Sequence, residues 1–173
     1  IEETVALELL SPPEGAPLIT AIGDYGGFVH WDPDRPAPQG NFTNPRFGNT
    51  HGIACAWRKP EIIVRVGIRA ERDEKSNIGY SLDAGKTWRP APQPEQNSAR
   101  GHIAVSADGR TWVWTPQRST PYGTADRGQT WTACEGLPRD TRVVADTVNP
   151  AEFYAMDLYS GTLFVSSDAG RSF

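Results

Sequence analysis

The sequence has few of the residues that form disulfide frameworks or metal centres. Its 173 residues include two cysteines and three histidines. Two cysteines cannot form a disulfide framework or a four-ligand metal site, and the histidines at positions 30, 51 and 102 lack the spacing of metal ligands. We therefore expect no metal and no other cofactor, and we expect Cys55 and Cys134 to be buried free thiols.

Long apolar runs and a strong positive charge are also missing. No apolar run approaches the roughly 20 residues that a membrane-spanning helix needs. The formal net charge of -4 and the absence of a basic stripe argue against nucleic acid as a partner. The first four residues contain no basic region followed by an apolar stretch, so we expect any signal peptide to have been removed or to lie outside this sequence.

Short runs of β-branched and aromatic residues are separated by 15 prolines and 17 glycines, a pattern typical of many short strands joined by turns. No convincing amphipathic helix is present, so the sequence predicts an all-β fold. We expect strands at residues 18–22, 27–31, 62–66, 102–106, 111–115, 153–156 and 162–166.

An eight-residue motif occurs three times, as SLDAGKTW at residues 81–88, TADRGQTW at 124–131 and SSDAGRSF at 166–173. This is the pattern of an Asp box, or BNR repeat. The aspartate can accept hydrogen bonds within the turn, the glycine supplies a positive φ, and the last aromatic residue is buried between strands. The aspartates recur at an interval of about 42 residues, the length of one four-stranded propeller blade. We expect the three aspartates to have structural roles.

The repeat length divides residues 1–173 into about four blades of a β-propeller. Because each blade packs against two neighbours, we expect the chain to be a segment of a longer polypeptide, or to complete its ring with another copy. A fourth, imperfect copy of the motif at residues 106–112 lacks one residue, and we expect it to be an Asp-Gly hairpin turn.

Residues 11–30, SPPEGAPLITAIGDYGGFVH, resemble the opening of the second propeller in glycoside hydrolase family 74. That family includes xyloglucanases and reducing-end-specific oligoxyloglucan cellobiohydrolases. TNP at residues 43–45, IIVRVG at 62–67, DTVNP at 146–150 and FY at 153–154 are similar to the same family in the same order. The resemblance covers essentially the whole chain. It implies that the four blades are part of a seven-bladed propeller in a longer, two-propeller protein.

The resemblance also implies an activity. Family members hydrolyse β-1,4-glucosidic bonds with inversion, and each of their two propellers supplies one catalytic aspartate. Asp24 matches the general acid, and the general base would lie in a first propeller that this sequence does not contain. Inversion needs two carboxyl groups roughly 6.5–9.5 Å apart, so we expect the segment alone to be inactive. The expected substrate, xyloglucan or a related β-glucan, does not enter cells, which predicts a secreted protein.

Sugar binding uses flat aromatic faces beside hydrogen-bonding groups. The candidate substrate-binding residues lie outside the repeat motifs, and the alternative for each of them is packing in the core or in a loop. They are Tyr25, His30, Trp31, His51, Trp57, Trp114 and Tyr159.

Two other functions are compatible with the repeats. A non-catalytic propeller that binds glycans or proteins, as sortilin-like receptors do, would hold Asp24 against backbone amides and away from a ligand. A sialidase would need an arginine cluster for a carboxylate and a tyrosine nucleophile paired with an acid, and no early arginine motif of that kind is present.

Overall fold

The computed structural model describes residues 4–72, 76–94 and 99–173. The regular secondary structure of these residues consists of β-strands. The strands form four antiparallel sheets, each built from strands that follow one another in the chain. The first sheet contains β1 (Ala6–Leu10), β2 (Leu18–Ile22) and β3 (Gly26–His30); the second, β4 (Phe47–Ala56), β5 (Lys59–Arg69), β6 (Ile78–Ser81) and β7 (Arg89–Pro90); the third, β8 (Gly101–Val105), β9 (Trp112–Pro116), β10 (Tyr122–Thr124) and β11 (Thr132–Ala133); the fourth, β12 (Val143–Ala145), β13 (Phe153–Met156) and β14 (Leu163–Ser166). In the described part of the chain, no helix could cross a membrane.

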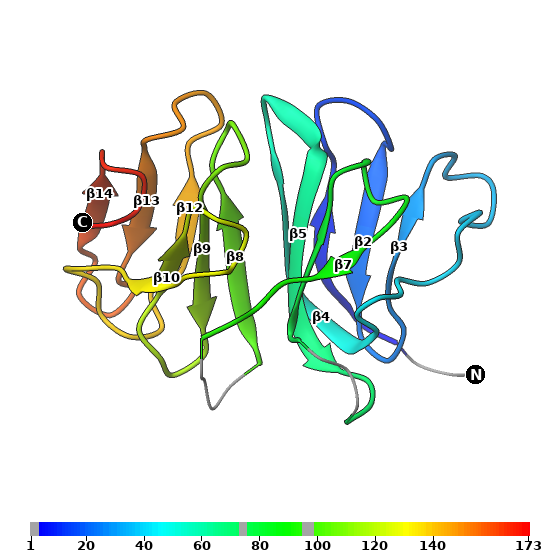
Figure 1. Cartoon of the computed structure of the whole chain (residues 1–173), viewed down its shortest axis with the longest axis horizontal. Helices are drawn as coiled ribbons and strands as arrows, with labels where there is room; N and C mark the ends of the chain where they lie inside the picture. The colour runs from blue at the N-terminus through cyan, green and yellow to red at the C-terminus, as the bar shows by residue number, and fades with distance from the viewer. Residues whose placement is uncertain (1–3, 73–75, 95–98) are drawn as a thin grey trace.

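The four sheets lie side by side in chain order, so the two termini are at opposite sides of the molecule (Figure 1). The first strands of neighbouring sheets contact each other: β1 contacts β4, β4 contacts β8, and β8 contacts β12. This is the arrangement of propeller blades, whose innermost strands surround the ring axis. The predicted fold class is therefore confirmed: the chain is a four-blade segment of a β-propeller.

The strands arise where the sequence predicts them and also at places that it does not mark. All seven predicted strands are present, β2 and β13 with the predicted bounds and the others within a few residues of them. The longest missed strand is β4, whose sequence FGNTHGIACA contains two glycines and few β-branched residues. Strands β7 and β11 are two residues long, too short for a periodic pattern.

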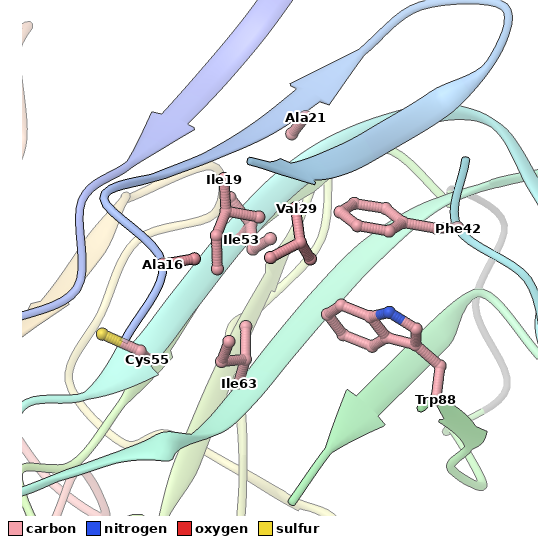
Figure 2. Packing of buried hydrophobic residues seen from close by; sticks show 9 residues of the cluster. All are labelled: Ala16, Ile19, Ala21, Val29, Phe42, Ile53, Cys55, Ile63 and Trp88. Carbon is pink, nitrogen blue, oxygen red and sulfur yellow. The ribbon is translucent and has the colours of Figure 1, made fainter. Parts of the chain in front are cut away.

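Apolar side chains form three core clusters, one between each pair of neighbouring sheets. Figure 2 shows the first cluster, in which Ile19 and Val29 of the first sheet meet Ile53 and Ile63 of the second. Successive residues of a strand face opposite sides of its sheet, and strand β5 is covered on both sides. Its continuous apolar run therefore packs Ile63 into the first cluster and the next residue, Val64, into the second.

The two cysteines lie in different clusters and are buried and free, as predicted. Burial raises the pKa of the Cys55 thiol to about 11. Burial, with a smaller contribution from the Asp168 carboxylate, raises that of Cys134 to about 12. Both therefore remain protonated thiols near neutral pH, a form that is a poor nucleophile.

The three repeat motifs form turns with a shared set of hydrogen bonds. Asp126 accepts the O–H of Thr124 at 2.8 Å, and both the N–H and the O–H of Thr130, at 2.9 and 2.6 Å. The same contacts recur at Asp83 and Asp168. These carboxylates hold the turn that follows the third strand of a sheet. The imperfect copy is different: it forms the turn of the β8–β9 hairpin, as predicted.

Candidate functional site

Asp24 lies in the turn between β2 and β3. Ile22 pairs with Gly26, so the turn consists of residues 23–25. The N–H of Tyr25 donates to the carbonyl of Gly23 at 2.7 Å, which closes a γ-turn with Asp24 at its centre. Asp24 has a φ of 64°, a left-handed conformation that is uncommon for a residue other than glycine.

The glycines after Asp24 allow the hairpin to pack closely. A Cβ atom on Gly27 would lie 2.0 Å from the carbonyl oxygen of Thr20 and 2.6 Å from the ring of Phe42. A Cβ atom on Gly26 would lie 2.8 Å from the carbonyl oxygen of Phe47. A side chain at Gly26 would push the hairpin away from β4, and one at Gly27 would clash with the paired strand β2 and with Phe42, so the two glycines allow the hairpin to form and to pack beside β4.

The side chain of Asp24 is presented to solvent. Asp24 is exposed, and within the described residues its carboxylate accepts no hydrogen bond. The aspartates of the repeat turns differ in this respect, because their carboxylates are occupied by hydroxyl and amide donors of their own turn.

Three predicted site residues lie at the other end of the strands. Strand β3 runs away from the Asp24 turn, which places His30 about 13 Å farther along, at roughly 3.3 Å per residue. His30 is within hydrogen-bond distance of the hydroxyl of Thr20, at 3.2 Å, and Trp31 donates from its indole N–H to Gln39. Trp57 is exposed in the turn that follows β4, a strand that begins beside Asp24. The fold therefore does not bring these three side chains to Asp24.

Trp114 belongs to the core. Its accessible surface is 0%, and its ring packs edge-on against that of Trp131 at 6.2 Å between centroids. A sugar would find no face of this ring to stack on, so Trp114 is a core residue and the prediction that it contacts substrate is wrong. Alternating residues of a buried strand and of a half-exposed strand can look alike in sequence, which explains the error.

Tyr25, His51 and Tyr159 lie at the Asp24 end of the sheets. Tyr25 adjoins Asp24 in the turn, and His51 follows two residues after Asn49, whose side chain contacts the turn. Tyr159 is fully exposed in the turn between β13 and β14, the equivalent in the fourth sheet of the turn that carries Asp24.

Two recesses open at this end of the molecule. The larger has a volume of about 740 Å³ and contains Tyr159; the smaller, of about 310 Å³, contains His51. They share Gln117 and Asp140, so they are adjacent. The other residues that line the smaller recess are Arg100, Gly101, His102 and Thr115.

The smaller recess is polar and holds neutral imidazoles near neutral pH. Burial lowers the pKa of His51, and the nearby Arg100 and His102 lower it further. Burial and then Arg142 lower the pKa of His102, against a smaller opposing effect of Glu8. In the described chain, Nε2 of His51, Nδ1 of His102 and the hydroxyl of Thr115 have no hydrogen-bond partner. A neutral imidazole has one donor and one acceptor nitrogen, which suits it to hydroxyl groups.

Sequence reasoning did not find Arg100, His102, Gln117 or Asp140. They come from the beginning of β8, the end of β9 and the segment before β12, which meet only when the sheets pack. The described residues contain no group of three or more His, Cys, Asp or Glu side chains that could hold a metal ion.

Known proteins resemble this chain over its whole length. It is 37% identical over 174 residues to a xyloglucanase of Acetivibrio thermocellus, covering 100% of this chain and 20% of that protein. It is 36% identical to an oligoxyloglucan-reducing end-specific xyloglucanase of Emericella nidulans, of which it covers 24%. The crystal structure of the xyloglucanase of Xanthomonas campestris, a member of glycoside hydrolase family 74, superposes with a TM-score of 0.89 at 40% identity, over 99% of this chain and 24% of that one.

The chain thus spans a quarter or less of the length of these relatives. No family model matches it. Sequence identity and a common fold along the entire chain nevertheless show that it belongs to glycoside hydrolase family 74.

Proposed function

We propose that this chain supplies one of the two catalytic carboxyl groups of an inverting β-1,4-glucan hydrolase that acts on xyloglucan, with Asp24 as the general acid. The observation that carries the proposal is an exposed carboxylate that accepts no hydrogen bond from the residues the structure describes, on a turn whose backbone is tightly held. A general acid must reach the glycosidic oxygen with its proton, so it has to be positioned and at the same time open to substrate. The relatives whose names describe xyloglucan hydrolysis support the choice of substrate.

The same end of the sheets offers groups suited to a sugar chain. Tyr25 lies beside Asp24, and the exposed ring of Tyr159 lies at the larger recess, while His51 contributes a neutral imidazole to the smaller one. Aromatic faces stack on sugar rings, and neutral imidazoles exchange hydrogen bonds with hydroxyl groups. In this proposal the three side chains contact the glucan from the first, second and fourth blades.

The proposal requires a second carboxyl group from elsewhere in the protein. An inverting hydrolase needs a base roughly 6.5–9.5 Å from the acid, on the other side of the scissile bond, to activate water. We place this base in a propeller outside the present sequence. The 173-residue chain alone is then inactive, and a polymeric substrate implies that the intact protein acts outside the cell.

The first prediction concerns Asp24→Asn in the full-length protein. Because Asn cannot donate the carboxylic proton, we expect kcat on xyloglucan to fall by about 10²–10⁴-fold. An aryl glycoside whose leaving group departs without protonation should retain most of its rate. Release of reducing ends measures the first reaction and absorbance of the freed phenol the second.

Asp34→Asn is the matched control, since Asp34 is another exposed aspartate and follows the last strand of the first sheet. The Asp34→Asn protein should hydrolyse xyloglucan at the wild-type rate. If Asp24→Asn hydrolyses xyloglucan normally, Asp24 is not the acid. If the wild-type protein binds xyloglucan and never cleaves it, the non-catalytic propeller is the correct alternative.

A further inference from the structure

The Asp24 turn is held from three separate parts of the chain. At Gly23, the N–H donates to the carbonyl of Val5 at 2.9 Å, and the carbonyl accepts the hydroxyl of Thr4 at 2.7 Å. At Asp24, the N–H donates to Oδ1 of Asn49 at 2.9 Å. One residue later, the carbonyl of Tyr25 accepts the side-chain N–H of Asn41 at 3.3 Å. The main chain is therefore bonded on both sides of Asp24, while the carboxylate is exposed.

Asn49 differs from the other partners because it comes from the next blade. It lies on β4 opposite Ile68, and the pairing of β4 with β5 is irregular on both sides of this position. Irregular pairing of this kind turns a side chain out of the regular alternation, and it is frequent beside active sites. The bulged part of β4 thus directs the Asn49 amide toward the first blade.

Gly23, the residue before Asp24, packs against Asn49 and Val5. A Cβ atom on Gly23 would lie 3.5 Å from Oδ1 of Asn49, an ordinary contact distance, and 3.3 Å from the side chain of Val5, which is tighter. The partner in the turn is a backbone N–H, so the atom of Asn49 that meets it must be the amide oxygen. The bond is therefore specific to a residue with an acceptor at this place.

A left-handed aspartate at the centre of a γ-turn keeps its conformation only where the surroundings impose it. The contact with Asn49 is the one that acts on Asp24 itself. It lies at the surface, so water can replace the acceptor if Asn49 is removed, and the fold does not depend on it. What the bond restricts is the direction in which the Asp24 side chain leaves the turn.

We propose that Asn49 is a positioning residue for the general acid, so that the direction of the Asp24 carboxyl is set by a contact between two blades. This inference rests on the proposed role of Asp24. In this inference Asn49, on the second blade, contributes to catalysis without itself contacting the substrate. A displacement of about 1 Å of a catalytic group can lower the rate by about 100-fold, so a single hydrogen bond is sufficient for the effect.

The experiment compares Asn49→Ala, Asn49→Asp and Asn149→Ala in the full-length protein. Asn49→Ala removes the acceptor, and we expect kcat on xyloglucan to fall by about 10- to 100-fold, with KM within about twofold of wild type. Asn49→Asp keeps an acceptor oxygen at the same position, and we expect it to restore kcat to within a few-fold of wild type. Asn149 also accepts a backbone N–H, that of Ala151 in the fourth blade, so its replacement by Ala is the matched control with unchanged kcat.

Hydrogen exchange of the Asp24 amide gives a readout that does not depend on activity. Exchange should be faster in Asn49→Ala, close to wild type in Asn49→Asp and unchanged in the control. A wild-type kcat in Asn49→Ala would overturn the proposal, and so would an equal loss in Asn49→Asp. Neither result bears on the role of Asp24, which is tested separately by Asp24→Asn. That role fails only if Asp24→Asn still hydrolyses xyloglucan.

Discussion

Arg65 shows how one buried residue organises the junction between the first two blades. It lies on β5 and is fully buried. Three aromatic rings surround its guanidinium group at 4.3–4.9 Å, those of Phe42, Phe47 and Trp88. The guanidinium also donates to the carbonyl groups of Thr43 and Pro45, at 3.1 and 2.5 Å. These contacts hold the segment that connects the first sheet to the second.

We predict that Arg65→Lys lowers the free energy of unfolding by about 2–4 kcal/mol, because an ammonium group cannot stack flat on the rings or reach both carbonyl groups. Urea unfolding at neutral pH measures the change. Arg35→Lys is the matched control at an exposed site and should alter the free energy of unfolding by less than about 0.5 kcal/mol. An equal, small effect of both substitutions would mean that the planar geometry of Arg65 is not required.

At the level of the structural element, the repeat turns stabilise the ionised form of their aspartates. The pKa of Asp126 is about 2, below its ordinary value of 3.8, chiefly because it accepts the hydroxyl and then the backbone N–H of Thr130. The pKa of Asp168 is also about 2, with Ser172 in the equivalent role. A carboxyl whose pKa is lower in the folded state stabilises the fold above its ordinary pKa. This stabilisation disappears as the pH falls from about 4 to about 2.

Thr130→Val tests this contribution, since it removes the hydroxyl and keeps the backbone N–H. At pH 7 we expect the urea midpoint to fall by about 0.5 M relative to wild type. The difference should shrink as the pH falls below about 4 and be clearly smaller near pH 2, where about half of the Asp126 carboxyl groups are protonated in the wild-type protein. Thr132→Val, an exposed change on β11, provides a control whose effect should not vary with pH. A Thr130→Val effect of equal size at pH 7 and pH 2 would contradict the assignment.

Over the whole molecule, Glu8 connects three of the four blades. It lies on β1 in the first blade and accepts the backbone N–H of Ile53 in the second at 2.9 Å. Its other carboxylate oxygen accepts a hydrogen bond of 2.6 Å from the guanidinium group of Arg142, which lies just before the first strand of the fourth blade. Both contacts lie among the innermost strands, so Glu8 links the first blade to the second and to the fourth.

Glu8→Ala should therefore lower the free energy of unfolding more than Arg142→Ala does. The first change leaves the N–H of the buried Ile53 without its acceptor, which we expect to lower the free energy of unfolding by about 1–3 kcal/mol. Arg142 has a half-exposed side chain, and its loss should cost less than about 1 kcal/mol. Urea unfolding of both variants and of the double variant separates the terms. A larger loss for Arg142→Ala would indicate that the ion pair, and not the bond to Ile53, holds the blades together.

The outer faces of the first and fourth sheets carry several exposed apolar side chains. Exposed apolar residues of these two sheets include Leu7, Leu9, Val144, Met156, Leu163 and Val165. The faces between sheets are packed into the three core clusters instead. A blade normally has neighbours on both sides, and none of the residues that the structure describes covers these two faces.

The candidate site could be predicted only in part. Asp24 was found through the resemblance of residues 11–30 to glycoside hydrolase family 74, and the structure places it in the turn between β2 and β3. Asn49 and Asn41 hold the same turn from 25 and 16 residues away in sequence, and no local pattern marks them. Trp114 was predicted at the site and lies in the core, because its neighbours in sequence do not reveal that the second sheet covers this face of β9.

Strands, turns and the length of the blade could be predicted from the order of residues, because each depends on hydrogen bonds and side-chain alternation within a few neighbouring positions. Which aromatic residues are exposed, how the recesses form and what holds Asp24 depended on the packing of one blade against the next. Those contacts join segments up to 134 residues apart, as between Glu8 and Arg142. Their geometry follows from the lateral stacking of the sheets, and only the folded structure contains that information.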